Sequence, residues 1–374
     1  MRVFFKTLLL LLAQWAWVWS LDCFAATSDP APPAMKQQAE TKGYASFANR
    51  DEIVAKAKQE GKLRVAAEIE APTIKATTAA FKKKYPFIDL YVEETTGTEA
   101  MQRRFLALKS GMAKEWDVIS VSTELYDEIV AHLWRVDLFG LASGGVLAIP
   151  PQMIDPKNRN VMAFFSRFQV TAYNKQLLPA GQVPKTWEDF LKPEFKGKKF
   201  AADVRPSEIA YLVPAWGLEK TLAFARKIAA QQPIWVRGGS RTLTAMIAGE
   251  IPLFIGPNFH TVKRAQSKDR AGRLQYVVLE PVPLRLAGQV GIQAGVQHPH
   301  AALLWLEWMA SPEAQRLIDE HEPLASSVYV RGGFVERELV GKELSLLGWE
   351  DRAKAGDWEK KIFEAYGFPR AERK

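Results

Sequence analysis

Cysteine is almost absent from this sequence, because Cys23 is the only one among 374 residues. A single cysteine excludes an intrachain disulfide and a metal site built from several thiolates. The sequence also lacks a Gly-x-Ser-x-Gly elbow, a His-x-x-x-His pair and a glycine-rich phosphate loop, which mark many hydrolases, metalloenzymes and nucleotide-binding enzymes. A hydrolase built on Ser240 and His260 has no third residue to orient the histidine. We therefore predict that the protein is not an enzyme and needs no cofactor.

An apolar run stands at the N-terminus, where Arg2 and Lys6 precede the segment from Leu8 to Trp19. This pattern predicts a signal peptide, residues 1–25, and a flexible leader, residues 26–43, rich in Pro, Ala and Gln. The protein would then be periplasmic, and cleavage would remove the cysteine. The run is shorter than the roughly 20 residues of a spanning helix, but a retained anchor and a lipid anchor on the cysteine stay alternatives.

Basic residues outnumber acidic ones, and the formal net charge is +8. No run of Lys and Arg interleaved with aromatic residues occurs, and Lys82 to Lys84 fit the exposed end of a helix. We therefore predict no nucleic-acid partner, whereas an acidic small molecule suits the charge. With 48% hydrophobic residues, a chain of this length can form two packed domains.

Helix and strand patterns alternate from Asn49 onward. Asn49 can cap a helix that ends at Gly61, because Ile53, Val54 and Ala57 fall on one face. The elements expected next are strands at 62–67, 87–92 and 116–121 and helices at 72–84, 98–110 and 124–134. Such alternation predicts an α/β fold with a mostly parallel sheet flanked by helices.

In such a sheet, ligands bind beyond the carboxyl ends of the strands, where loops lead into helix N-termini. The loops after the first three strands are small, hydroxylated or acidic, and their candidate ligand-binding residues are Glu68, Glu70, Thr96, Gly97, Ser120 and Ser122. The two glutamates could instead form a salt bridge across a closed cleft. The hydroxyl groups could also serve as helix caps.

The segment from Phe168 to Pro179 lies near the middle of the chain. It reads as a short buried strand ending at Tyr173 and Asn174, followed by a helix capped by Thr186. We predict that the chain crosses here from one lobe to another, with Tyr173 as either core packing or a cleft wall. The extended segment from Gly288 to Gly295 would be the return crossing.

The part between these crossings repeats the order of strand, loop and helix. Its candidate ligand-binding residues are Arg205, Ser207, Ser240, Arg241, Asn258 and His260. Arg205 and Arg241 each stand close to a serine and a helix N-terminus, an arrangement that suits an anion. The alternative is that each arginine pairs with a surface carboxylate.

These patterns predict two α/β lobes joined by two hinge strands. We assign residues 44–167 and 287–374 to the first lobe and residues 168–286 to the second, with hinge strands near 168–173 and 281–292. The amphipathic, basic segment from Trp349 to Tyr366 is expected to pack on the first lobe.

Three motifs carry a family resemblance: Tyr173-Asn-Lys, Lys185-Thr-Trp-Glu-Asp-Phe-Leu, and the region from Gly291 to Leu317, where an apolar helix ends in Ser-Pro-Glu-Ala-Gln. With them, the chain from about residue 50 to Tyr366 resembles the solute-binding proteins of bacterial ABC importers, in the two-lobed class related to ferric-iron-binding proteins. The resemblance implies a periplasmic binding protein fold of type 2 and a monomer that closes on its solute. It also implies an ABC permease in the inner membrane as partner.

The iron-binding members of that class carry adjacent tyrosines after the strand that corresponds to Ile251 to Ile255, but this sequence has Pro257-Asn-Phe-His260 there. These residues cannot replace two phenolates as ligands of Fe(III). We therefore predict no metal and a small polar solute, anionic or zwitterionic. Three alternatives remain. The ligand could be ferric iron, His260 could form a poorer metal site with Glu68 or Glu70, or the protein could be a ligand sensor beside a membrane receptor.

Overall fold

The computed structural model describes residues 33–95, 98–111, 115–123, 125–322 and 325–368. The predicted signal peptide, with its cysteine, and the candidates Thr96 and Gly97 lie outside these ranges. Within them, no helix is both long and apolar enough to cross a membrane.

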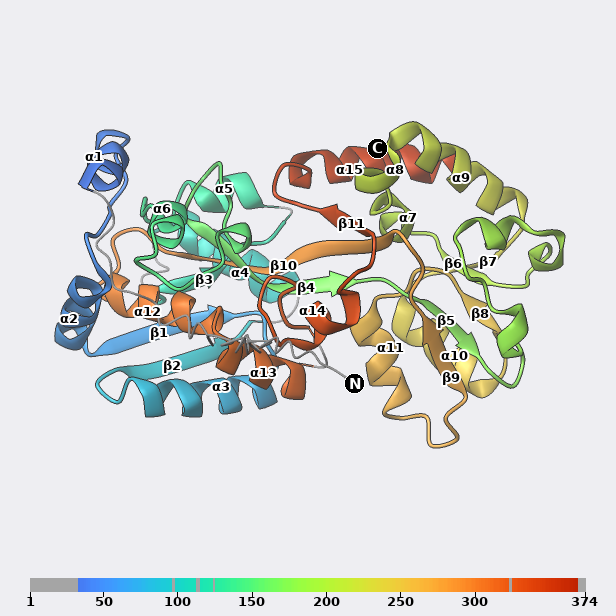
Figure 1. Ribbon diagram of the computed structural model, residues 1–374, viewed down its shortest axis with the longest axis horizontal. Coiled ribbons are helices and arrows are strands. Elements are labelled where there is room, and N and C mark those ends of the chain that lie inside the picture. The colour runs from blue at the N-terminus through green and yellow to red at the C-terminus, as the bar shows by residue number, and fades with distance from the viewer. Residues whose placement is uncertain (1–32, 96–97, 112–114, 124, 323–324, 369–374) are drawn as a thin grey trace, which may run out of the picture.

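Two β-sheets occupy the two halves of an elongated molecule, and helices flank both of them (Figure 1). The strands of the first sheet are β1 (Lys62–Ala67), β2 (Asp89–Glu94), β3 (Val118–Ser120), β4 (Val161–Phe168), β10 (Val282–Ile292) and β11 (Leu344–Leu347). Their order is β11-β10-β3-β1-β2, and β4 also pairs with β10. The chain therefore has the predicted two-lobed α/β architecture.

The second sheet has the order β7-β6-β8-β5-β9. Its strands are β5 (Thr171–Asn174), β6 (Ala201–Asp203), β7 (Ile234–Val236), β8 (Leu253–Phe254) and β9 (Leu274–Val277). The helices around it are α7 (Ser207–Ala210), α8 (Val213–Trp216), α9 (Leu218–Ala230), α10 (Gly239–Ala248), α11 (Phe259–Gln266) and α15 (Arg352–Ala365).

The remaining helices belong to the first half of the molecule or to the region where the two halves meet. They are α1 (Pro33–Thr41), α2 (Arg50–Glu60), α3 (Ala71–Lys84), α4 (Thr98–Lys109), α5 (Tyr126–Val130), α6 (Leu138–Ser143), α12 (Pro299–Met309), α13 (Pro312–His321) and α14 (Phe334–Leu339). Helix α12 is buried over nearly all its length and forms the centre of the first core.

Local signals in the first lobe match the structure closely. Asn49 accepts a hydrogen bond from the backbone N–H of Glu52 at 2.9 Å, and Gly61 ends α2 in the left-handed conformation, as predicted. Strand β1 has the predicted bounds and is parallel to β2 and β3. The carboxyl ends of these strands therefore point toward the second lobe, where the candidate loops lie.

Several predicted elements are shorter than expected. The helix expected at 124–134 is reduced to α5, and the one capped by Thr186 is a single 3₁₀ turn, Glu188–Leu191. The described part of the predicted flexible leader contains α1, in which Ala39 is buried. Hydrophobic periodicity over one or two turns does not distinguish an α-helix from such short turns.

In the mid-chain segment the chain passes from the first sheet to the second, and two separate strands stand there instead of one. Strand β4 ends the first-lobe pairing at Phe168, and β5 begins the second-lobe pairing at Thr171. The return crossing lies at residues 278–281, between β9 and β10. The segment from Gly288 to Gly295 is therefore not the crossing, because most of it belongs to β10 inside the first sheet.

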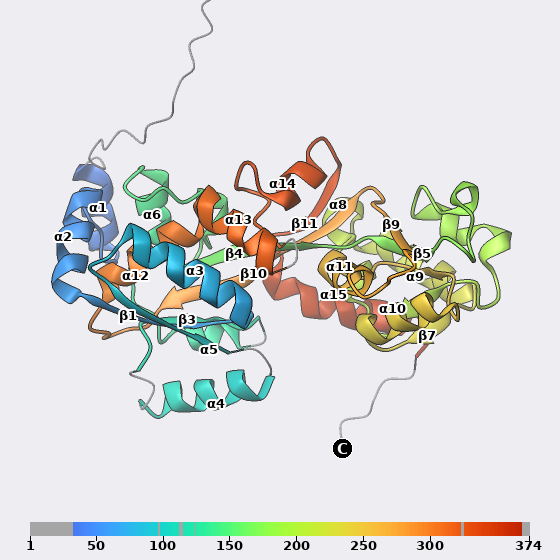
Figure 2. The same cartoon turned by 90° about the horizontal axis from the view of Figure 1, so that it is seen from below.

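The C-terminal helix does not pack where we expected. Helix α15 lies along α9 and α7, and Figures 1 and 2 both show it beside the second lobe. Ile362 and Tyr366 are buried in the second-lobe core, with Trp235 4.9 Å from the Tyr366 ring. The prediction for the segment from Trp349 to Tyr366 is therefore wrong for most of its length. Only its start contacts the first lobe, where Trp349 packs against the cluster of Leu108 and Ile119 and Arg352 donates to Asp127 at 3.0 Å. The other predicted lobe boundaries stay a prediction.

Candidate functional site

The floor of the candidate site is the antiparallel ribbon of β4 and β10. Arg167 and Arg285 stand directly opposite each other in this ribbon, so their side chains leave it on the same face. The other face is packed: the Ser166 hydroxyl accepts a hydrogen bond from the Val328 N–H, and Phe168 stacks on Phe259. The ribbon therefore separates a core face from an open face that carries two arginines.

A small compartment of about 170 Å³ lies on the open face. It is lined by Glu68, Val121, Ser122, Thr123, Phe165, Arg167, Arg285, Ala287, Gly288 and Gln289. Glu68 follows β1 and Ser122 follows β3, so the predicted carboxyl-end loops of the first lobe do reach this compartment.

A large compartment of about 560 Å³ adjoins the small one. Its wall combines Thr123 and Asp127 from the first lobe, Ser207 and Tyr211 from the second, and the end of β11 with α15. Thr123, Arg285 and Gln289 line both compartments. The two compartments therefore adjoin and share part of their walls, and together they are called the hollow below.

Positive charge marks the small compartment. The Nε of Arg167 is buried and makes no hydrogen bond to any residue that the structure describes. Burial, together with the charge of Arg285, lowers the pKa of Arg167 to about 10, so the side chain stays charged at neutral pH. A buried guanidinium without a hydrogen-bond partner on Nε is costly, and an anion in the compartment would offset that cost.

His260 stands at the start of α11, close to this charge. Burial and the nearby charges of Arg167, Arg264 and Arg285 lower the pKa of its imidazole to about 3. The ring is therefore neutral at physiological pH and adds no charge, although it can still donate or accept a hydrogen bond.

Glu70 forms a salt bridge across the cleft. Its carboxylate pairs with Arg264 of α11, which belongs to the second lobe. The Glu322 carboxylate accepts a hydrogen bond from the Glu70 N–H at 3.3 Å, and its other oxygen is 4.0 Å from Arg264. Burial and the neighbouring Glu70 raise the pKa of Glu322. Of the two interpretations of Glu70, the structure shows the salt bridge.

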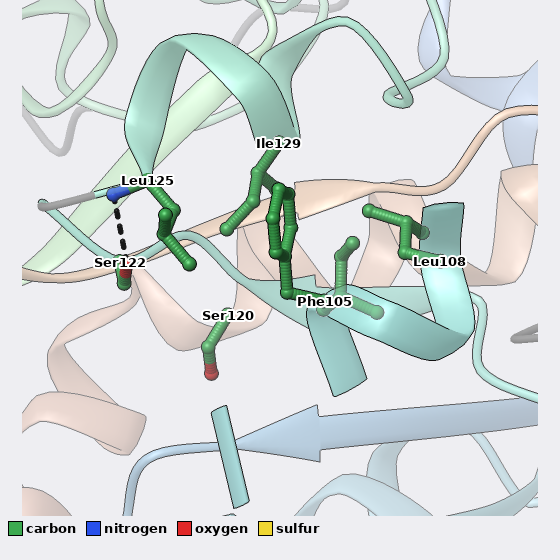
Figure 3. Close-up of a pocket in the computed structure, with 7 residues that line it drawn as sticks. Phe105, Leu108, Ser120, Ser122, Leu125 and Ile129 are labelled. Atoms are coloured by element: carbon green, nitrogen blue, oxygen red, sulfur yellow. Dashed lines mark hydrogen bonds between the residues drawn. The ribbon is translucent and has the colours of Figure 1, made fainter. Parts of the chain in front are cut away.

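The two serine candidates of the first lobe have local hydrogen bonds. Ser120 donates to the Ala66 carbonyl at 3.2 Å, and Ser122 accepts from the Leu125 N–H at 3.2 Å. Both also border an apolar cavity of about 20 Å³, but Figure 3 shows the Ser120 hydroxyl turned away from the Phe105 and Ile129 side chains. This cavity is too small for a solute. Ser122 closes the turn that precedes α5 and also lines the small compartment, whereas Ser120 is not part of that lining.

Among the second-lobe candidates, only Ser207 lines the hollow. Ser240 and Arg241 are exposed at the start of α10, and Tyr173 packs against the second-lobe core. Asn258 precedes α11, and its backbone forms a bridge with Gln169 of the mid-chain crossing. The packing interpretation of Tyr173 therefore fits the structure better than a cleft wall.

Arg205 is engaged within its own loop. Its guanidinium donates to both oxygens of Asp203, at 3.1 and 2.7 Å, and the Gly238 N–H donates to the same carboxylate. The hydrogen bonding of its guanidinium to Asp203 is the largest influence that raises the pKa of Arg205. The pairing of Arg205 with a carboxylate, rather than with an anionic ligand, is the alternative that the sequence left open.

Replacing Arg205 with alanine is therefore expected to act on stability rather than on solute binding. Buried Asp203 would lose its only described charged partner while keeping backbone N–H donors, and we expect a loss of about 1–3 kcal/mol in the free energy of unfolding, measured by urea denaturation. Arg241→Ala is the matched control, because that side chain is exposed and should change stability by less than about 0.5 kcal/mol. An Arg205→Ala protein of normal stability that no longer bound solute would contradict this assignment.

Sequence reasoning missed Arg167, Arg285 and Gln289. A signal was present, because each arginine is the single charged residue of an otherwise apolar strand: Val-Met-Ala-Phe-Phe-Ser-Arg-Phe in β4 and Val-Pro-Leu-Arg-Leu-Ala-Gly-Gln-Val-Gly-Ile in β10. A lone charge in a buried strand must face solvent, a partner or a ligand. We did not predict the strand at 161–168, so the pair could not be recognised.

A metal site has little support in these residues. Within the described ranges, no group of three or more His, Cys, Asp or Glu side chains could hold a metal ion. The charges of Arg167, Arg264 and Arg285 act on His260, and these charges disfavour binding of a metal cation at that position.

Comparisons with known proteins agree with this architecture. The sequence model described as "Bacterial extracellular solute-binding protein" matches residues 76–321. Comparison with curated proteins finds no match. A Mannheimia haemolytica ferric iron-binding protein A in an open conformation has a TM-score of 0.63 and 19% identity, over 82% of this chain and 98% of that one.

Two further solved structures are similar. A Trichodesmium protein in complex with iron and citrate has a TM-score of 0.60 and 18% identity, over 82% of this chain and 99% of that one. The substrate-binding protein of an Agrobacterium tumefaciens ABC transporter has a TM-score of 0.56 and 15% identity, over 83% of this chain and 96% of that one. At such identities the likeness establishes the fold.

Proposed function

Because the chain belongs to the family of bacterial extracellular solute-binding proteins, we propose that it captures a small polar anion or zwitterion between its lobes and delivers it to an ABC permease. Proteins of this family bind solutes without transforming them, and the prediction that the chain is not an enzyme is confirmed. We further propose that the protein works in the periplasm after removal of its signal peptide.

The observation that carries the proposal is the pair of Arg167 and Arg285 on the open face of the ribbon. Two guanidinium groups opposite each other repel each other. An anion that bridges them attracts both groups and offsets this repulsion. The Ser122 hydroxyl and the Gln289 amide line the same compartment and can complete the hydrogen bonds of an oxyanion. Glu68 in the same wall could take the cationic group of a zwitterion.

Ferric iron is a second candidate, because two of the similar structures are described as a ferric iron-binding protein and as a complex with iron and citrate. An iron complex of an organic acid would offer carboxylates to the two arginines even without tyrosine ligands from this chain. Bare ferric iron fits the hollow poorly, since Arg167 and Arg285 would repel it.

Mass spectrometry of the solute released from the purified wild-type protein tests the proposal. We expect an organic anion or zwitterion, and we expect it to be absent from Arg285→Gln prepared in the same way. Iron detected by elemental analysis at one equivalent, with no organic solute, would support the second candidate and contradict the first.

Uptake measurements separate an importer subunit from a sensor. Cells that lack the protein should lose uptake of the labelled solute. Normal uptake together with a lost transcriptional response would favour the sensor alternative.

A further inference from the structure

Three charged residues meet at the boundary between the lobes, outside the hollow. Glu70 stands directly before α3, and Glu322 stands directly after α13. Arg264 belongs to the last turn of α11 in the second lobe, and Figures 1 and 2 both show α11 beside α13 where the two halves meet. None of the three residues lines either compartment. They therefore form a contact between the lobes that is separate from the candidate solute site.

The contact joins one cation to two carboxylates. The Arg264 guanidinium donates to the Glu70 carboxylate, and its Nη2 lies 4.0 Å from Oε2 of Glu322. The Glu70 N–H donates to Oε1 of Glu322 at 3.3 Å, so the first lobe holds the two acidic residues side by side. Burial and the charge of Glu70 raise the pKa of Glu322, whereas the charge of Arg264 lowers it. The second lobe therefore supplies the positive charge that compensates two carboxylates of the first lobe.

The exposure of the pair suits a contact that opens and closes. The side chains of Arg264 and Glu70 are 43% and 39% exposed. When the lobes separate, water can solvate both groups, so neither is left buried without a partner. An exposed ion pair adds little to the stability of a fold, but it can change the ratio of two arrangements of the lobes by up to about fivefold.

A second ion pair between the two halves has a different character. The Arg352 guanidinium donates to Asp127 at 3.0 Å and lies 3.5 Å from the centre of the Tyr126 ring, and its side chain is only 14% exposed. Nearby, the Trp349 indole N–H donates to the Gln152 carbonyl at 3.1 Å. These contacts attach the start of α15 to the first lobe, close to the end of β11. We therefore expect the lobes to separate at the side of α11.

We propose that Arg264, Glu70 and Glu322 form a latch that holds the two lobes together while no solute is bound. A latch of this kind raises the population of the closed arrangement before capture, so a solute meets a smaller conformational cost when it binds between the lobes. Because the latch contacts no part of the hollow, it acts in the same way whatever the solute is.

The experiment measures the distance between the lobes in the absence of solute. In the chain with Cys23→Ser, two introduced cysteines are the only labelling sites. Ala79→Cys in α3 and Thr244→Cys in α10 are exposed, and neither changes a charge; α10 packs on α11. Spin labels at these positions give the distance distribution by pulsed electron paramagnetic resonance, after bound solute is removed by unfolding in urea and refolding. We expect a short distance to dominate.

Arg264→Met should raise the ratio of long to short distances by about two- to fivefold. Arg264→Glu should raise it further, because it places a third negative charge beside Glu70 and Glu322. Glu70→Gln should resemble Arg264→Met, since the Glu70 side chain makes no capping hydrogen bond to α3. Arg226→Met is the matched control, because it removes the same charge from an exposed position on α9 and should leave the ratio unchanged.

Sodium chloride at about 1 M shortens the Debye length to about 3 Å and weakens exposed ion pairs. It should therefore raise the ratio of long to short distances in the protein with the latch and leave the ratio in Arg264→Met unchanged.

The failure of the latch and the failure of the anion site give different results. Equal distance distributions with and without the Arg264 substitutions would overturn the latch, as would a long distance that already dominates in the unsubstituted protein. An equal change in Arg226→Met would also overturn it. Each of these outcomes leaves anion capture standing, because no solute is present. Normal solute capture by Arg285→Gln would overturn the anion site and leave the latch standing.

Discussion

Replacing Arg167 with methionine is expected to abolish solute capture without weakening the free protein. The side chain lies in a ribbon whose opposite face is packed in the core, and its Nε is buried without a hydrogen-bond partner among the described residues. A charge-assisted pair to a bound anion contributes about 2–5 kcal/mol, so affinity should fall about thirtyfold or more.

The free protein should respond in the opposite sense. Methionine keeps the apolar length of the arginine stem and removes a buried cation that faces Arg285. Like charges opposite each other in a ribbon are destabilising. We expect the melting temperature of the solute-free variant to equal or exceed that of the wild type, as measured by calorimetry.

Arg241→Met is the control for this experiment, because it removes the same charge from an exposed position on α10 outside the hollow. It should leave both affinity and melting temperature unchanged. A marked fall in the stability of solute-free Arg167→Met would show that the arginine is structural. Unchanged affinity would remove Arg167 from the site.

The contrast between predicted and observed site residues has a physical cause. Glu68, Ser122 and Ser207 were predicted because the carboxyl ends of parallel strands form a general binding edge, and all three line the hollow. Arg205 satisfied the same rule, but its partner Asp203 stands only two residues away and neutralises it. The rule that ligands bind at the carboxyl ends of parallel strands locates this edge from the sequence. It does not show which polar side chains there already have a hydrogen-bond or ion-pair partner in the fold.

The C-terminal helix shows a second limit. Its amphipathic pattern was visible, but the choice of lobe depends on contacts with α7 and α9, which come from a distant part of the sequence. This placement matters for function, because α15 supplies one wall of the large compartment. Part of the wall of the large compartment therefore comes from a segment whose position local sequence patterns do not determine.

Gly288→Ala is expected to cause a large loss of stability in the ribbon of β4 and β10. Gly288 lies inside β10 with a φ of 62°, a conformation that costs an alanine about 1–2 kcal/mol. A Cβ there would also stand 2.6 Å from Cδ2 of Phe165 and 3.2 Å from Cζ of Phe164. These rings are buried and packed 4.3 Å apart, so neither can move aside easily.

Adding the strain of the backbone to this overpacking gives an expected loss of about 3 kcal/mol in the free energy of unfolding, measured by urea denaturation. Gly181→Ala serves as control and should change stability by less than about 0.5 kcal/mol, because its Cβ meets nothing and its φ is ordinary. A loss below about 1 kcal/mol in Gly288→Ala would show that the ribbon can relax around the new methyl group.

The same substitution tests how the ribbon and the site are connected. Gly288 lies between Arg285 and Gln289 in the wall of the small compartment, and Phe165 lines that wall as well. If the methyl group pushes β4 and β10 apart, the two guanidinium groups no longer converge on one anion. Folded Gly288→Ala protein should therefore bind solute more weakly than the wild-type protein. Adding Phe165→Leu removes the ring edge that clashes with the new methyl group. The double variant should therefore regain part of both the affinity and the stability. Restored stability with no gain in affinity would separate the packing of the ribbon from the alignment of its arginines.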